Sequence, residues 1–296
     1  MFTGLSAFPL TPLDAGVVDQ KVYVRLIQNL AEAKVDSIGA LGSTGSYAYL
    51  NRDERFQVAR IAVDEAGDVP VIFGIGAHYE RDVLYLAEDA QKAGAKGLLL
   101  PALSYQRLTP DEVYGLYESV SNAASVPIVV YDNPGTTHFE FSDELHARIA
   151  ALPNVRSIKL PGVPAAPADA RQRVERLRAI IPSSVTLGVS GDAFAATGLN
   201  AGCEVWYSAL AGLFPRICLS LTRTALAGQA AEAVLQSERL EPLWSLFRQY
   251  GSLRVVASAA EIMGHVQHES LPRPLKGLDP VGHERLSAFL EVCELT

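Results

Sequence analysis

Short runs of apolar and β-branched residues recur along the chain, and amphipathic stretches of helical periodicity separate them. Most runs lie about 25–35 residues apart, which is the repeat of a strand–helix unit in a parallel sheet. The runs are apolar throughout rather than alternating, as expected of strands that are covered on both faces. This pattern predicts eight strands, at residues 3–8, 36–41, 70–75, 96–100, 127–131, 155–159, 185–190 and 203–208.

Capping residues mark the starts of several of the helices between these strands. Asn51-Arg52-Asp53-Glu54 has the spacing of a capping box, in which the first and fourth side chains bond backbone N–H groups. Thr109-Pro110-Asp111-Glu112 combines a cap with a proline in the first turn, and Ser142-Asp143-Glu144 forms a further cap. These starts support a regular alternation of strands and helices.

Eight successive strand–helix units predict an α/β fold, the (β/α)8 TIM barrel, because right-handed crossovers close such a sheet in sequence order. After about Leu213 the strand pattern ends. Four helices are predicted beyond it, at residues 216–227, 231–250, 253–265 and 282–294, and Pro272-Arg273-Pro274 interrupts the last pair. We therefore expect a barrel over residues 1–228 and a small C-terminal helical bundle over residues 229–296.

Composition fits this architecture and excludes some classes of partner. A chain of 296 residues with 49% hydrophobic side chains can fill one large core, and such barrels commonly run to about 250 residues or more. The net charge of −8 comes without a cluster of Lys or Arg, which argues against nucleic acid or an anionic membrane as a partner. No apolar run approaches the ~20 residues of a membrane helix.

The cysteines and the N-terminus indicate where the protein works. Cys203, Cys218 and Cys293 are odd in number, scattered, and without the spacing of metal ligands, which is typical of thiols in a reducing compartment. The opening Met1-Phe2-Thr3-Gly4 has no basic region followed by an apolar one, so no signal peptide is expected. We expect a soluble cytoplasmic protein.

Lys159 ends the sixth predicted strand, and Leu160-Pro161-Gly162 follows at once. Because barrel active sites lie at the C-terminal ends of the strands, this amine would be held on a rigid element and directed into the site. Burial disfavours the charged amine, lowers its pKa and leaves the neutral nucleophile that imine formation with a carbonyl requires. A solvated strand end is the more common explanation for an arbitrary lysine.

Other strand ends place polar groups on the same rim. Gly42-Ser43-Thr44-Gly45-Ser46 follows the second strand, where glycines and free N–H groups suit a carboxylate or phosphate, although an ordinary turn is the simpler interpretation of this motif alone. Tyr131 ends the fifth strand, where its hydroxyl would shuttle protons. The seventh strand ends in Ser190-Gly191-Asp192. The eighth ends in Trp206-Tyr207-Ser208, whose rings predict a pocket partly lined by aromatics.

Taken together, these motifs resemble the dihydrodipicolinate synthase / N-acetylneuraminate lyase family. The similarity runs from Phe2 to the C-terminal helices and rests on the order of Gly42-Ser43-Thr44-Gly45, Tyr131-Asp132-Asn133-Pro134, Ile158-Lys159 and Ser190-Gly191-Asp192. The resemblance implies a lyase or aldolase that forms a Schiff base with pyruvate or a related 2-oxo acid and takes an aldehyde as partner. It also implies that no metal or organic cofactor is needed.

By this resemblance, Lys159 would form the imine and Tyr131 would be the general acid/base. Ser43 would stand in a proton relay that Tyr105 completes from a neighbouring subunit, which implies a dimer or tetramer of this chain. Thr44 and nearby N–H groups would hold the carboxylate of the 2-oxo acid. Further substrate contacts are expected from Gly45, Gly191, Tyr207 and Thr136.

Several positions depart from the family pattern, among them Ser46 and Thr136. Ser46 stands where the glycine-rich motif commonly continues to Glu. Thr136 stands where the synthase branch carries an arginine that pairs with the carboxylate of aspartate semialdehyde, so a charge-assisted contact is lost. This loss argues against aspartate semialdehyde as the second substrate. An authentic 4-hydroxy-tetrahydrodipicolinate synthase, a 2-keto-3-deoxy sugar-acid dehydratase and a non-catalytic barrel that binds 2-oxo acids remain alternatives.

Overall fold

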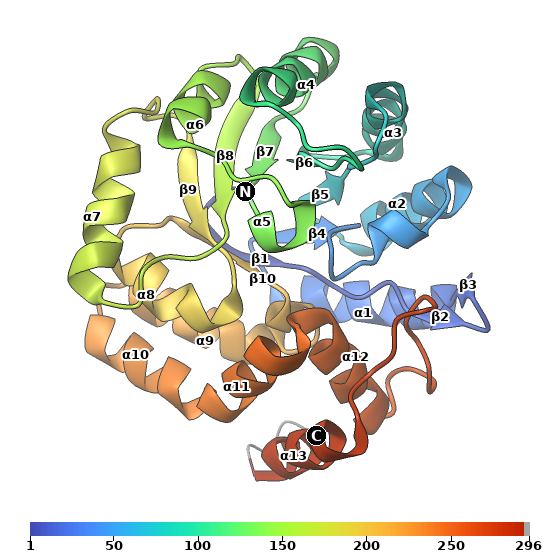
Figure 1. Ribbon diagram of the computed structural model, residues 1–296. Coiled ribbons are helices and arrows are strands. Elements are labelled where there is room, and N and C mark those ends of the chain that lie inside the picture. The colour runs from blue at the N-terminus through green and yellow to red at the C-terminus, as the bar shows by residue number, and fades with distance from the viewer. Residues whose placement is uncertain (293–296) are drawn as a thin grey trace.

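The computed structural model describes residues 1–292 and contains a closed barrel of eight parallel strands (Figure 1). Their order around the barrel is β1-β10-β9-β8-β7-β6-β5-β4. The strands are β1 (Gly4–Ala7), β4 (Ser37–Ala40), β5 (Val71–Gly74), β6 (Gly97–Pro101), β7 (Ile128–Tyr131), β8 (Val155–Leu160), β9 (Thr186–Val189) and β10 (Val205–Ser208). All eight predicted strands are present, and the predicted (β/α)8 barrel is confirmed.

Helices form the outer layer of the barrel (Figure 1). They are α1 (Gln20–Ala33), α2 (Arg52–Glu65), α3 (Glu80–Ala93), α4 (Pro110–Ala123), α6 (Asp143–Ala150), α7 (Pro167–Arg178), α8 (Ala195–Asn200) and α9 (Pro215–Leu226), with the short α5 (Pro134–Thr137) after β7. Asn51 forms the predicted capping box, Thr109 forms the predicted cap and completes a capping box with Glu112, and Ser142 accepts a hydrogen bond from the N–H of Leu145. A small antiparallel hairpin, β2 (Leu13–Asp14) with β3 (Val17–Val18), was not predicted.

In the described part of the chain, four helices follow the barrel and lie along one side of it (Figure 1). They are α10 (Ala230–Arg239), α11 (Glu241–Tyr250), α12 (Ser252–Ile262) and α13 (Pro280–Val292). The prediction of one helix over residues 231–250 is wrong, because Leu240 separates two helices and Pro242 in the first turn of α11 has no N–H to continue the ladder. The end of the predicted last helix, residues 293–294, lies outside the described residues. A domain boundary at residue 228 remains a prediction.

Apolar side chains fill two separate layers. The barrel interior holds one cluster, made by Phe8, Ile72, Leu99, Val129, Tyr131, Val205 and Tyr207. A larger cluster fills the space between the strands and the helices. Successive residues of a strand point to opposite faces, so Tyr207 points into the barrel while Trp206, fully buried, packs toward the helices. The expectation that Trp206 lines the pocket is therefore wrong.

The cysteines are described only in part. Cys203 and Cys218 are buried free thiols, and Cys293 lies outside the described residues. Within residues 1–292, no helix has the length and apolar character needed to cross a membrane.

Candidate active site

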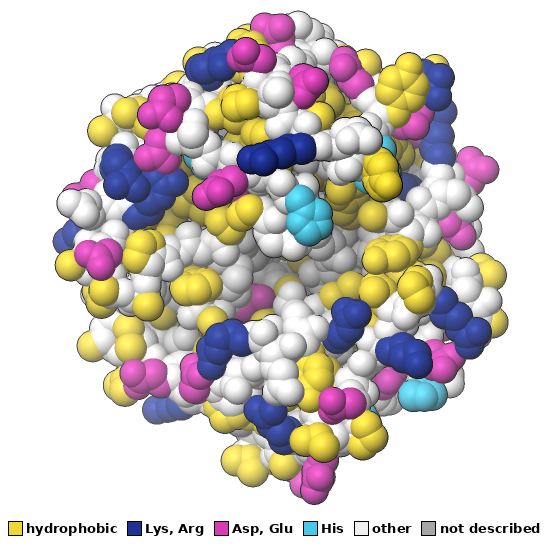
Figure 2. Space-filling view, in the orientation of Figure 1, with side chains coloured by type: hydrophobic (Ala, Val, Ile, Leu, Met, Phe, Trp, Pro, Cys, Tyr) yellow, Lys and Arg dark blue, Asp and Glu magenta, His cyan; other side chains and the backbone are white. Residues whose placement is uncertain are grey.

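A cavity of about 610 Å³ opens at the C-terminal end of the barrel strands. Figure 2 shows this hollow at the centre of the face, with apolar, basic and acidic side chains mixed around its rim. Its volume falls in the range of small-molecule sites, about 300–1,000 Å³. The cavity is lined by most of the side chains predicted for the site: Ser43, Thr44, Tyr131, Thr136, Lys159, Gly191 and Tyr207.

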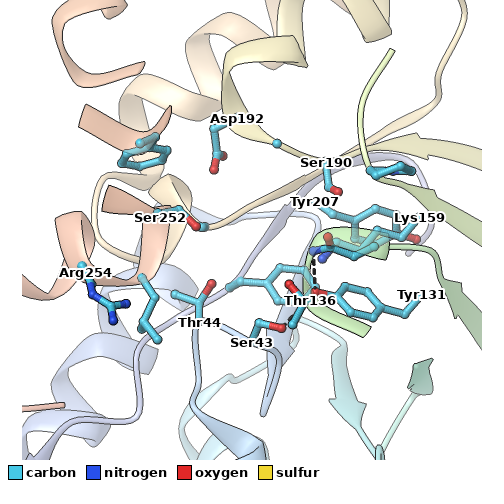
Figure 3. A pocket seen from close by; sticks show the side chains of 18 of the residues that line it. Ser43, Thr44, Tyr131, Thr136, Lys159, Ser190, Asp192, Tyr207, Ser252 and Arg254 are labelled. Atoms are coloured by element: carbon cyan, nitrogen blue, oxygen red, sulfur yellow. Dashed lines mark hydrogen bonds between the residues drawn. The ribbon is translucent and has the colours of Figure 1, made fainter. Parts of the chain in front are cut away.

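Lys159 lies on β8 with its amine inside the barrel mouth (Figure 3). Strand register places it beside Tyr131 on β7 and Gly188 on β9. Its side chain is buried, and Nζ lies 4.2 Å from the centre of the Tyr131 ring and 4.7 Å from that of Phe8. Burial lowers the pKa of Lys159, although the negative charges of Tyr131 and Asp192 oppose the shift. The net effect favours the neutral amine.

Gly188 makes room for an aromatic ring beside the amine. A Cβ atom at Gly188 would lie 2.3 Å from the ring of Tyr207, so a larger residue there would displace that ring. The Tyr207 hydroxyl donates to the Ser157 hydroxyl oxygen at 2.7 Å. Burial raises the pKa of Tyr207. Tyr207 therefore contributes a neutral aromatic wall rather than a proton donor to the cavity.

Tyr131 holds its phenol at the centre of a small hydrogen-bond network (Figure 3). Its hydroxyl oxygen lies 2.9 Å from that of Ser43, and the Asn133 side-chain amide donates to it at 3.0 Å. Burial raises the pKa of this phenol, but the charge of Lys159 and hydrogen bonds with Ser43, Asn133 and Thr136 outweigh it, so the net pKa is lowered. A buried phenol with a lowered pKa is suited to taking up and returning a proton.

The turn after β4 exposes backbone donors to the cavity. Leu41 and Ser46 have left-handed backbone angles (φ 55° and 53°) that turn the chain sharply. Within residues 1–292, the backbone N–H groups of Thr44 and Gly45 find no protein acceptor. A Cβ atom on Gly45 would lie 3.1 Å from the backbone nitrogen of Leu41, and Gly45 is not among the residues that line the cavity, so its predicted substrate contact stays a prediction. The turn resembles a carboxylate-binding nest.

The chain matches the model of the Dihydrodipicolinate synthetase family over residues 1–292. It belongs to this family. A solved dihydrodipicolinate synthase from Agrobacterium tumefaciens is 42% identical, with a TM-score of 0.94 over 98% of this chain and 97% of that one. One from Thermotoga maritima is 27% identical, with a TM-score of 0.92 over 100% of both chains. A 4-hydroxy-tetrahydrodipicolinate synthase of Pseudomonas aeruginosa is 31% identical over 97% of this chain and 96% of its own length.

Family membership confirms the resemblance drawn from the strand-end motifs and the prediction of a lyase of the dihydrodipicolinate synthase type. One residue predicted for the site, Tyr105, lies away from the cavity. Tyr105 lies between β6 and α4 with 91% of its surface exposed, and it does not line the cavity of its own chain. Its expected role depends on a neighbouring subunit and remains a prediction.

The sequence placed Asp192 at a strand end on the rim, but no role was predicted for it. Asp192 is buried there and accepts a hydrogen bond from the Ser208 hydroxyl at 2.5 Å. Burial raises the pKa of Asp192, although Ser208 and the charge of Lys159 act against it. The position of Asp192, three residues after the end of β9, was the signal for a role in the site. Within residues 1–292, no group of three or more His, Cys, Asp or Glu side chains is arranged to hold a metal ion.

Helices α11 and α12 supply the outer wall of the cavity, which strand-end reasoning did not reach. Trp244, Phe247 and Arg248 come from α11, and Ser252, Leu253 and Arg254 form the first turn of α12. Figure 3 shows Ser252 and Arg254 across the cavity from Lys159. A substrate bound at Lys159 would therefore extend toward residues of the C-terminal helices.

Proposed function

We propose that this protein makes or breaks a carbon–carbon bond through an imine between Lys159 and pyruvate or a related 2-oxo acid. One observation carries the proposal: a buried amine of lowered pKa lies beside the phenol of Tyr131, which Ser43 contacts at 2.9 Å. A solvated lysine at a strand end would have neither the burial nor the acid/base partner.

Each step of the proposed reaction has a group in place. The neutral amine of Lys159 attacks C2 of the 2-oxo acid, and Tyr131 protonates the departing hydroxyl so that water leaves and a protonated imine remains. The positive nitrogen withdraws electrons, so C3 can give a proton to the phenolate of Tyr131, which regenerates the phenol and leaves an enamine. The enamine carbon then attacks an aldehyde carbonyl, and the reverse sequence cleaves the same bond. The free N–H groups of Thr44 and Gly45 would hold the substrate carboxylate.

Deuterium exchange tests this function without knowledge of the aldehyde. Enamine formation removes a proton from the methyl group of pyruvate, and in D₂O a deuteron returns. We expect proton NMR to show enzyme-dependent loss of the pyruvate methyl signal. A non-catalytic barrel that only binds 2-oxo acids would give none. Lack of exchange with pyruvate and with every other short 2-oxo acid would contradict the proposal.

The pH dependence of this exchange is expected to reflect two shifted groups. Its rate should rise as Lys159 loses its proton, below the usual 10.5, and fall as Tyr131 loses its proton, below the usual 10.0. Ser43→Ala removes a hydrogen bond that lowers the Tyr131 pKa, so the falling limb should move to higher pH. Ser6→Ala, at a buried serine of β1 outside the cavity, is the matched control. A falling limb that stays in place in Ser43→Ala would contradict the role of this contact.

An authentic 4-hydroxy-tetrahydrodipicolinate synthase is the second candidate, because relatives such as the Pseudomonas aeruginosa protein carry that name. Thr136 puts a neutral side chain where the synthase branch would carry a cation. We therefore expect slow condensation of pyruvate with aspartate semialdehyde. A rate on the order of 1 s⁻¹ or more would favour the authentic synthase. A sugar-acid dehydratase would use the same imine and would instead release water from its substrate.

We also propose that the chain works as a dimer or tetramer in which Tyr105 completes the relay of a neighbouring site. Co-expression of Tyr105→Phe and Lys159→Met chains tests this directly. A mixed oligomer would contain sites with Lys159 from one chain and an intact Tyr105 from the other. We expect activity above that of either variant alone, whereas no recovery in isolated mixed oligomers would contradict a role in trans. The cytoplasmic location remains a prediction from the scattered thiols.

A further inference from the structure

We propose that the mouth of the cavity binds a second anionic group of the substrate and that Arg254 is the residue that holds it. The inference rests on the proposed function, because the imine at Lys159 fixes one end of the substrate as a 2-oxo acid. The substrate is then a dianion, and its second carboxylate, which the aldehyde partner carries, lies at the far side of the cavity from Lys159.

The cationic side chains of the cavity differ in whether they already have a role or an interaction partner. Among the residues that the structure describes, three such side chains line the cavity: Lys159, Arg248 and Arg254. Lys159 is the proposed nucleophile, and Arg248 forms an ion pair with Glu241. Arg254 is half-buried, and within residues 1–292 it has neither an ion pair nor a hydrogen-bond acceptor for its guanidinium. A planar guanidinium in this state is suited to a bidentate contact with an incoming carboxylate.

The backbone around Arg254 adds a second set of donors. Arg254 lies in the first turn of α12, which begins at Ser252 after Gly251, and no side chain caps this end. Within residues 1–292, the N–H groups of Ser252, Leu253 and Arg254 find no acceptor, and these three residues and Gly251 all line the cavity. The first turn of an 11-residue helix presents partial positive charge. Guanidinium and backbone donors thus face the same space.

The placement of Arg254 separates the two ends of the site. In Figure 3, Lys159 and Tyr131 lie on one side of the cavity and Arg254 on the other, with Thr44 and Ser252 between them. Asp192, the one carboxylate among the lining residues, bonds to Ser208 and forms no ion pair with Arg254 within the described residues. A substrate with a single anionic group would leave Arg254 unpaired, whereas a dianion would use both ends.

Matched pairs of 2-oxo acids test the inference. The half-saturating concentration for borohydride trapping would be measured for dicarboxylic acids (2-oxoglutarate, 2-oxoadipate, 2-oxopimelate) and for the monocarboxylic 2-oxo acids of equal carbon number. For at least one chain length, we expect the half-saturating concentration of the dicarboxylic acid to be about tenfold lower than that of the monocarboxylic acid of equal carbon number. Arg254→Gln should bring this ratio close to one, and Arg254→Lys should keep part of it. Arg60→Gln, on the exposed face of α2, removes the same charge outside the cavity and should keep the full ratio.

The outcomes distinguish this inference from the function beneath it. If pyruvate forms no imine with the unaltered protein, the proposed function itself fails. If pyruvate is trapped but the ratio is near one at every length, or if Arg254→Gln preserves it, the second anion subsite is wrong. A ratio that falls in Arg254→Gln and survives in Arg60→Gln assigns the subsite to Arg254.

Discussion

Lys159→Met is expected to lose activity and gain stability at the same time. Without the amine no imine forms, so pyruvate exchange should fall by at least about 10³-fold. The gain in stability has an electrostatic origin. Burial lowers the pKa of Lys159 from 10.5, so below that folded-state pKa the native protein carries a buried charge that the unfolded chain solvates in water.

The sign of the stability effect follows from proton binding. Between the lowered pKa and 10.5 the unfolded chain holds the proton more tightly than the native protein, so the contribution of Lys159 to stability rises with pH through this window. Methionine carries no charge, and its advantage should therefore be largest below the folded-state pKa and shrink as pH rises. We expect the Tm at pH 7 to rise by about 2 °C or more.

Thermal unfolding and the exchange assay, measured on the same preparations, check both effects. Lys96→Met, at an exposed lysine before β6, is the matched control and should change neither quantity appreciably. Retained exchange in Lys159→Met would remove the residue from the chemistry. A lower Tm in Lys159→Met would show that the buried amine does not destabilise the native protein.

Tyr131→Phe is expected to slow exchange by about 10²–10⁴-fold while leaving the capacity to form the imine. The substitution deletes the hydroxyl that contacts Ser43 at 2.9 Å and Asn133 at 3.0 Å. It keeps the ring that lies 4.2 Å from the amine of Lys159. Proton transfer should therefore suffer far more than the position of the nucleophile.

Rapid-mixing measurements of imine formation, together with exchange rates, check this division. In Tyr131→Phe we expect the imine to form slowly, but the final fraction of protein trapped as the imine should be close to that of the unaltered protein. Tyr23→Phe removes the hydroxyl of another fully buried tyrosine, on α1 and away from the cavity, and should exchange at a normal rate. An exchange rate in Tyr131→Phe within a few-fold of normal would exclude the phenol as the general acid/base.

The barrel and the inner half of the site were predictable from sequence for one physical reason. Uniformly apolar strands separated by helices specify a parallel sheet, and closure of that sheet brings all strand C-terminal ends to one rim. Once the strands were placed, Lys159 and Tyr131 had to lie on that rim, and the structure pairs them across β7 and β8. Neither conclusion required knowledge of how the helices pack.

The remaining features depend on packing that a linear pattern does not contain. A strand buried on both faces carries no polar alternation, so the sequence did not indicate that Tyr207 points inward and Trp206 outward. Arg254 lies in the first turn of a C-terminal helix, far along the chain from the barrel strands, and the packing of α12 at the barrel mouth brings it into the cavity. The helix break at Leu240 was not predicted, because the helical periodicity of residues 231–250 was given more weight than the proline at position 242.

Trapping of the imine by borohydride tests the central claim most directly. The protein would be treated with borohydride in the presence of pyruvate, its intact mass would be measured by mass spectrometry, and the adduct would be located by peptide mapping. We expect one pyruvate-derived adduct per chain, located on the peptide that contains Lys159 and absent from Lys159→Met. An adduct on a different lysine, or none with pyruvate or any short 2-oxo acid, would contradict imine chemistry at Lys159.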